Sequence, residues 1–145
     1  GSLTVDPVPV VLEVGDEAAA YGVNNLGVSC GQAAGLLPRA WLGEDPIELS
    51  ELRSKRGYYI WPHHPPLDIN NAGVIVGGAG NVDNLDAVVW ADLAAEPVLL
   101  ESFMPRRNPP FPRLKEATAI NENGLIVGRG WTGGADYYGF VAVPE

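Results

Sequence analysis

The chain has 145 residues, of which 46% are hydrophobic, so it is long enough for one domain with a substantial core. Its formal net charge of −9 argues against nucleic acid or an anionic membrane surface as a partner. The single cysteine excludes an internal disulfide, and no apolar run is long enough for membrane insertion. The 18 glycines and 13 prolines favour short strands and turns over long helices.

The N-terminal stretch begins with Gly1 and Ser2, a pair typical of a cloning remnant, so an export signal could have been trimmed away. Residues 7–14 are rich in valine and proline and predict a strand. Two similar stretches, 46–49 and 97–100, predict strands that precede the second and third copies of a repeated hairpin.

This repeated hairpin is the element around which the chain is organised. In each copy an Asn is followed three residues later by Gly, the spacing of a type I turn that ends in a left-handed residue. The three pairs are Asn24 and Gly27, Asn70 and Gly73, and Asn121 and Gly124. We predict that these six residues are structural and bind no ligand. Apolar, β-branched runs such as 125–127 flank the turns and predict inner strands buried on both faces.

A third strand is expected after each hairpin. It begins at Ala40, Ala87 and Gly139, which lie 16, 17 and 18 residues after the turn asparagine. The sequence therefore predicts a single all-β domain of three four-stranded antiparallel repeat units, at roughly 16–49, 66–100 and 115–145. The third unit has no fourth strand of its own, so we expect residues 7–14 to complete it.

The third hairpin, at residues 117–128, resembles the HAF repeat, the "probable extracellular repeat" of bacterial secreted and surface proteins. The family pattern is roughly Ala-x-Ala-Ile-Asn-x-x-Gly-x-Ile-Val-Gly, a variable loop, and His-Ala-Phe-x-Trp. In this chain the motif His is replaced by Arg39, Asp86 and Tyr138. Only the second repeat keeps the closing tryptophan, as Trp90. The resemblance covers most of residues 18–145 and implies a β-propeller-like arrangement and an extracellular or cell-surface location, with no established chemistry.

The N-terminal strand could complete the third unit in two ways. Within one molecule it would close a three-unit ring. Between two molecules it would make a six-bladed homodimer with exchanged strands, which we favour because propellers have about four to eight blades. A β-trefoil lectin also fits the length and the threefold repeat. However, the chain has no Gln-x-Trp signature, since Gln32 is its one glutamine.

The two connectors between repeats hold a candidate binding face. With Lys115 they carry seven of the nine basic residues of an acidic chain. Aromatic planes and guanidinium groups in such loops could receive a carbohydrate or an acidic protein partner. The candidate ligand-binding residues are Arg53, Arg56, Tyr58, Tyr59, Trp61, His63, Arg106, Arg107 and Phe111. The open alternative is that the aromatic rings pack under the sheets and the basic groups are only solvated.

Three further motifs do not indicate a reactive or metal site. Residues 27–31 match a nucleophile elbow, but they align with hairpin strands, and Cys30 takes the place of a buried hydrophobe. The adjacent His63 and His64 would point to opposite sides of an extended segment, which argues against a shared zinc ion. Counted from Asn81, an EF-hand needs an oxygen ligand at its fifth place, a glycine at its sixth and a glutamate at its twelfth, but these places hold Leu85, Asp86 and the shorter acid Asp92. We therefore expect no metal and no cofactor.

On function, the sequence favours a non-catalytic binding or scaffolding module of an exported bacterial protein, and it leaves enzymatic activity open. The alternative is a polysaccharide-active hydrolase or lyase that uses loop carboxylates such as Asp83, Asp86 or Asp136. Glycoside hydrolysis needs two carboxyl groups roughly 5 to 10 Å apart, a distance that depends on the fold.

Overall fold

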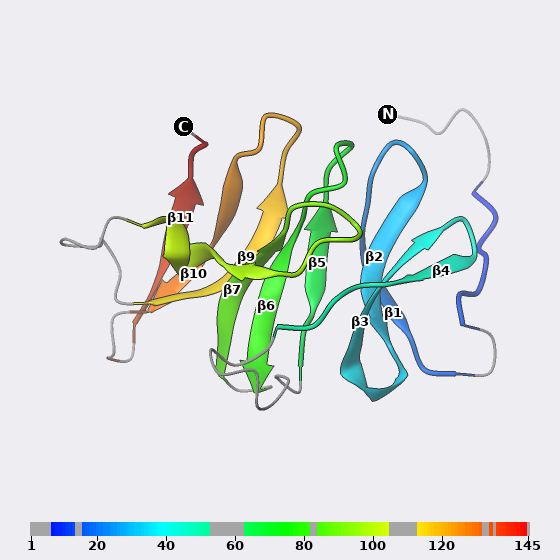
Figure 1. Cartoon of the computed structure of the whole chain (residues 1–145), viewed down its shortest axis with the longest axis horizontal. Helices are drawn as coiled ribbons and strands as arrows, with labels where there is room; N and C mark the ends of the chain where they lie inside the picture. Colours follow the sequence, from blue (N-terminus) through cyan, green and yellow to red (C-terminus); the bar gives the residue numbers. More distant parts are fainter. Residues whose placement is uncertain are drawn as a thin grey trace.

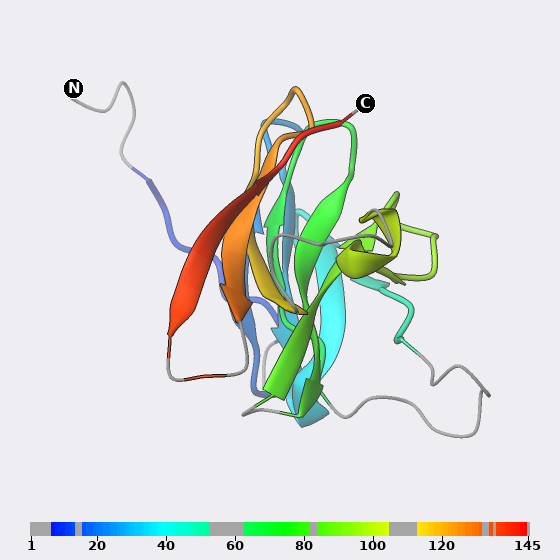
Figure 2. The same cartoon turned by 90° about the vertical axis from the view of Figure 1, so that its left-hand side faces the viewer.

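A computed structural model describes residues 7–13, 16–52, 63–81, 84–104, 113–131, 134 and 136–144. The protein is all-β, with two antiparallel sheets of four strands and one of three (Figure 1). The sheets lie side by side in chain order, and from the side of the third sheet the other two lie behind it (Figure 2). The described part contains two short 3-10 turns, Ala34–Leu36 and Leu100–Phe103, and no helix with the length and apolar character that a membrane span requires.

Each sheet is a meander in which every strand pairs with the next one along the chain. The first sheet contains β1 (Ala19–Val23), β2 (Val28–Ala33), β3 (Leu37–Leu42) and β4 (Asp45–Glu48). The second contains β5 (Pro66–Ile69), β6 (Ile75–Asn81), β7 (Asn84–Trp90) and β8 (Val98–Leu99). The third contains β9 (Arg113–Ile120), β10 (Ile126–Trp131) and β11 (Tyr137–Ala142). The all-β, antiparallel prediction is thereby confirmed, with four strands in the first two sheets.

The pairing of strands decides against the β-trefoil alternative. Among the described residues, every ladder joins strands of one repeat, and none joins strands of different repeats. A trefoil needs strands from all three repeats in one barrel. The short connections within each repeat favour the meander instead, because neighbouring strands are joined by tight turns.

The three Asn–Gly turns are confirmed. Gly27, Gly73 and Gly124 have positive φ angles of 83, 85 and 82°. The N–H of each glycine donates to the carbonyl of its asparagine, at 3.4, 3.1 and 3.1 Å. Each asparagine side chain also accepts backbone N–H groups from its own turn; the Val74 N–H, for example, donates to Asn70 Oδ1 at 3.0 Å. The six turn residues therefore have the structural role that was predicted.

A second glycine of each repeat lies seven residues after the turn asparagine, under a bulge in the first strand of its sheet. A Cβ atom on Gly31, Gly77 or Gly128 would lie 1.8, 2.0 or 1.9 Å from the carbonyl oxygen of Ala19, Pro65 or Glu116, respectively. No side chain fits at such distances. This close approach of the backbone explains why the repeated motif ends in glycine.

Strand pairing corrects the alignment of the third strands. Trp41 lies opposite Ser29 and Trp90 lies opposite Ile75, and both partners are the fifth residue after a turn asparagine. The closing tryptophan is therefore kept in two repeats, and the prediction that only Trp90 keeps it was wrong. Counting from the turn failed because the β2–β3 hairpin is shorter: its paired residues Cys30 and Ala40 are ten apart, whereas Val76 and Val89, in the same places, are thirteen apart.

The core consists of two apolar clusters, one in each junction between sheets. The cluster between the first and second sheets includes Val28, Cys30, Ile75, Val88 and Trp90. The cluster between the second and third includes Val76, Val89, Leu114, Ile126 and Phe140. Strand β6 is buried on both faces, so the predicted inner-strand character is confirmed for the middle sheet. In the third sheet Val127 is exposed, because no further described sheet covers its outer face.

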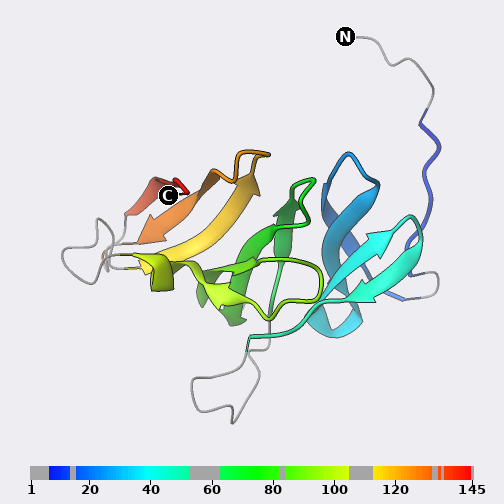
Figure 3. The ribbon, with the colours of Figure 1, turned by 45° about the horizontal axis from the view of Figure 1, so that its top comes forward.

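The N-terminal segment does not complete the third sheet of its own chain. Residues 7–13 form no strand, and they lie at the end of the molecule opposite β11 (Figures 1 and 3). The Glu13 carboxylate accepts hydrogen bonds from the Arg39 guanidinium and from Trp41 Nε1, the latter at 3.2 Å. These two donors hold the segment on the first sheet, so the predicted closed ring of three units within one chain was wrong.

Candidate binding groove

Of the predicted binding residues, the structure describes His63. The residues Arg53, Arg56, Tyr58, Tyr59, Trp61, Arg106, Arg107 and Phe111 lie outside the described residues. The remaining candidate, His63, is partly buried at the end of the first connector. Its Nδ1 lies 2.9 Å from Gln32 Nε2, and its carbonyl accepts the Gly80 N–H at 2.9 Å. Burial lowers the pKa of His63, and the nearby Glu116 carboxylate opposes that shift. His63 therefore joins the first and second sheets.

The neighbouring His64 anchors the same connector. It is 1% exposed, and its Nε2 accepts the Leu52 N–H at 2.7 Å. Burial lowers the pKa of the imidazole to about 4, and only the neutral ring can accept the Leu52 N–H at Nε2. Because Leu52 and His64 lie on either side of residues 53–62, this bond ties the two ends of the connector together.

The second connector is anchored by ionic contacts. Arg113 donates to both carboxylate oxygens of Asp86, at 2.7 and 2.9 Å, and Lys115 Nζ lies 3.9 Å from Asp86 Oδ1. Burial lowers the pKa of Lys115, while Asp86 raises it. Glu101 Oε1 accepts the Leu114 N–H at 2.6 Å. Both connectors therefore leave the sheets from fixed positions, which suits loops that carry a binding surface.

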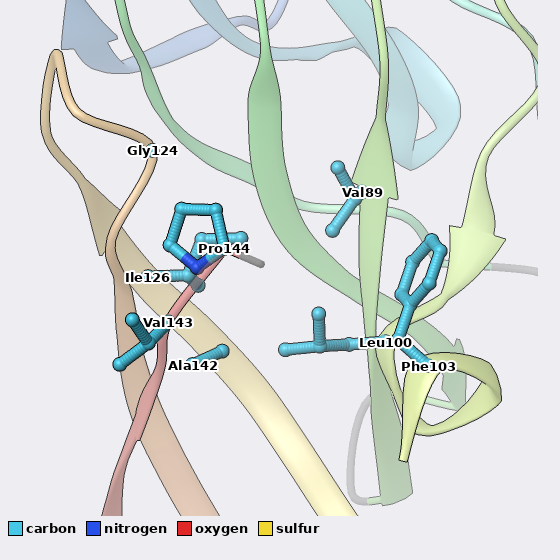
Figure 4. Close-up of a pocket in the computed structure, with 8 residues that line it drawn as sticks. All are labelled: Val89, Leu100, Phe103, Gly124, Ile126, Ala142, Val143 and Pro144. Carbon is cyan, nitrogen blue, oxygen red and sulfur yellow. The ribbon is translucent and has the colours of Figure 1, made fainter.

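An apolar groove with a volume of about 420 Å³ lies between the second and third sheets (Figure 4). The second sheet and the turn that follows it contribute Val89, Leu100 and Phe103, and the third sheet contributes Gly124, Ile126, Ala142, Val143 and Pro144. Phe103 belongs to the connector that was predicted to bind, and it is exposed. The groove lies within the range of about 300 to 1,000 Å³ that is usual for ligand pockets.

The groove exists because an alanine takes the place of a tryptophan. Ala142 lies opposite Ile126, as Trp90 lies opposite Ile75 and Trp41 opposite Ser29. Trp90 is fully buried in the first junction, where its indole N–H donates to the Ser50 carbonyl at 2.8 Å. In the second junction the small Ala142 leaves open the volume that an indole fills one repeat earlier.

A second cavity, of about 390 Å³, lies at the turn end of the first junction. It is lined by Asn24, Leu26, Val28, Ile69, Asn71, Ala72, Gly73, Asp92, Leu93 and Ala94. Several of these are turn residues whose polar groups already bond within or between turns, such as Asn71 Oδ1, which accepts the Asn25 N–H at 2.7 Å. The groove of the second junction is instead lined mainly by aliphatic and aromatic side chains that have no such bonds to make.

The weaker sequence motifs are consistent with their structural interpretation. Ser29 is the second residue of β2 and pairs with Val23 and Trp41, as expected of a hairpin strand and not of a nucleophile elbow. Cys30 is buried, and burial together with the Asp68 charge raises its thiol pKa to about 12. Within the described part of the chain, no group of three His, Cys, Asp or Glu side chains could hold a metal ion.

The groove residues were not singled out from the sequence. The available signal was the missing tryptophan of the third repeat, but it pointed to a cavity only once strand pairing had placed Trp41 and Trp90 together. In the comparisons with known proteins, no protein-family model, no curated protein and no solved structure matches the chain.

Proposed function

We propose that the chain is a non-catalytic binding module that receives an aromatic side chain of a protein partner in the groove between its second and third sheets. One observation carries this proposal: Ala142 leaves a groove where the equivalent Trp90 is fully buried. A ring brought by a partner would make the apolar contacts that Trp90 makes one junction earlier.

The surroundings of the groove support an aromatic occupant. Val89, Leu100 and Ile126 form apolar walls, and the exposed ring of Phe103 offers an edge or a face for stacking. Aromatic anchors in desolvated pockets supply much of the affinity of protein interfaces. Sheets of fixed geometry on both sides reduce the conformational entropy that binding would cost.

Architecture and location form part of the same proposal. Antiparallel meanders that pack face to face in chain order are typical of propeller blades, and the chain has two of four strands and one of three, so we propose a propeller-like arrangement. The resemblance to the HAF repeat supports an extracellular or cell-surface location. The hydrolase alternative receives less support, since Arg113 binds both oxygens of Asp86, one of its proposed acids.

The experiment uses N-acetyl-tryptophanamide as a probe and the methyl NMR signals of valine, leucine and isoleucine as the readout. We expect the probe to shift the signals of Val89, Leu100 and Ile126. Ala142→Trp should fill the groove and abolish these shifts, because position 142 would then carry the residue of the other two repeats. Tyr137→Trp is the matched control, since it adds an indole on an exposed position of the same strand.

Two outcomes would contradict the proposal. Probe-induced shifts that persist in Ala142→Trp would place the binding elsewhere. Binding that is lost only in a triple replacement of Arg53, Arg56 and Arg107 by Ala would move the site to the connectors and restore the first prediction. If the groove is the site, the triple variant should bind the probe as the wild-type chain does.

A further inference from the structure

The turns of neighbouring repeats are joined by a ladder of side-chain amides that is open at both ends. Asn24 Nδ2 donates to the Asn70 carbonyl at 3.1 Å, and Asn70 Nδ2 donates to the Asn121 carbonyl at 3.2 Å. Among the described residues, Asn121 Nδ2 has no acceptor, and the Asn24 carbonyl receives no amide from another repeat. The last turn therefore has a side-chain amide that could donate to the carbonyl of a first turn.

A second row of hydrogen bonds has the same direction. The Asn25 N–H donates to Asn71 Oδ1 at 2.7 Å, and the Asn71 N–H donates to the Glu122 carboxylate at 2.9 and 3.0 Å. Within the described part of the chain, no group of another repeat accepts the Glu122 N–H, and none donates to Asn25 Oδ1. These two groups are again a donor and an acceptor at opposite ends.

The outer faces of the end sheets expose positions that are buried inside the stack. Val23, opposite Ser29 in the first sheet, is 66% exposed, whereas the equivalent Ile69, opposite Ile75, is 3% exposed. On the third sheet Val141 is 60% exposed, whereas the equivalent Val89 is 9% exposed. Apart from Trp41, which is buried and bonds to Glu13, the outer faces of the first and third sheets are thus the two unpaired halves of the contact that holds the stack together.

The charges at the two ends are also complementary. Between the first and second sheets, Gln32 contacts His63. Gln32 lies eight residues after the first turn asparagine, and His63 lies seven residues before the second turn asparagine. The residues in these places at the open ends are Arg129 and Glu17. Arg129 already pairs with Glu116 at 2.9 Å and is half exposed, so its guanidinium has donors left for a second carboxylate.

The N-terminal segment has the sequence of the strand that the third sheet lacks. In β4 and β8 the residue after a proline, Ile47 or Val98, pairs with Ala40 or Val89 of the third strand. Val10 also follows a proline and, like Ile47 and Val98, is followed two residues later by a leucine, which is not true of Val8; Val10 is exposed. Val141 is the position on β11 that corresponds to Ala40 and Val89. Each of the three residues pairs with the sixth residue after the turn asparagine of its repeat.

We propose that a second copy of the chain docks its first sheet against the third sheet of the first copy, and that its residues 9–12 pair with the free edge of β11. The amide ladder would then continue from Asn121 to the second copy's Asn24. Used twice about a twofold axis, this contact closes a ring of six sheets, within the range of about four to eight in propellers. The proposal does not depend on ligand binding in the groove.

The first test measures the register of the exchanged strand. Val10→Cys combined with Val141→Cys should give a covalent dimer on a non-reducing gel, since residues directly opposite in an antiparallel pair have Cα atoms about 4.5 to 5.5 Å apart. The buried Cys30 thiol should not compete. Val8→Cys with Val141→Cys is the out-of-register control and should cross-link only to a small extent. A monomer with an internal disulfide, or equal cross-linking of both pairs, would overturn the proposal.

The second test measures mass by light scattering without any cross-link. The chain should scatter as a dimer of twice 15.4 kDa, and Val141→Lys should reduce it to a folded monomer. Phe103→Lys, an exposed change in the groove and not on the docking face, should leave the dimer intact. Arg129→Glu should weaken the dimer, and adding Glu17→Arg should restore it. A monomeric wild-type chain, or open oligomers of increasing size, would refute the closed ring.

Discussion

The buried His64 predicts a specific loss of stability in acid. Its imidazole is 1% exposed, accepts the Leu52 N–H, and has its pKa lowered by burial from 6.5 to about 4. Between these two pH values the imidazole of residue 64 is therefore protonated in the unfolded chain and neutral in the folded chain. Stability is fully present above pH 6.5 and falls as the pH drops towards 4. The loss should be about 2 kcal/mol at pH 5 and about 3 kcal/mol below pH 4.

Urea unfolding of wild type and of His64→Gln, measured from pH 7.5 to pH 4, isolates this contribution. Glutamine can still accept the Leu52 N–H, but it does not titrate. The variant should be less stable at pH 7, because a smaller side chain fills the imidazole site imperfectly. The difference between the two proteins should then shrink as the pH falls, whereas the carboxylates affect both proteins alike. A difference that stays constant with pH would refute the assignment of a neutral, buried His64.

Two further predictions test the turns and the connector anchor. Gly124→Val should lower the free energy of unfolding by about 1 kcal/mol or more, since φ at Gly124 is 82° and a Cβ would lie 3.3 Å from Pro144. Gly139→Ala, where a Cβ meets nothing within 4 Å, is its control, and an equal change in melting temperature would contradict the turn assignment. Asp86→Asn should cost about 1 to 3 kcal/mol, because it removes the carboxylate that faces Arg113 and the buried Lys115. An unchanged denaturant midpoint would show that this ionic contact is not an anchor.

The repeated turns were predictable because local chemistry alone determines them. An Asn that caps its own backbone and a Gly that accepts positive φ form the same turn in any context, so Asn70 and Gly73 were assigned correctly from spacing. Position along a strand is not local in this way. The third strands were misaligned because the length of a hairpin depends on its loop. No residue of the β2–β3 hairpin indicates from the sequence that this hairpin is shorter than the β6–β7 hairpin.

The N-terminal strand and the groove could not be predicted for a related reason. Residues 7–14 have the composition of a strand, but whether they pair depends on which edge is within reach, and Glu13 bonds to Arg39 and Trp41 of the first sheet. The groove depends on a side chain that is small. Ala142 is unremarkable in a list of residues, and it marks a site only when Trp90 is known to occupy the same place.

The third sheet separates the two proposed roles by the alternation of its side chains. On β11, Phe140 and Ala142 face the second sheet, and Ala142 lines the groove, whereas Val141 between them points outwards and is exposed. A substitution at 142 therefore changes the groove without entering the docking face, and a substitution at 141 does the reverse. If the ring forms, the exchanged strand pairs with the edge of β11 and leaves its inner face unchanged. Each copy would then keep its own groove, so a dimer should bind two aromatic ligands, and Val141→Lys should halve the assembly without reducing the affinity of each groove.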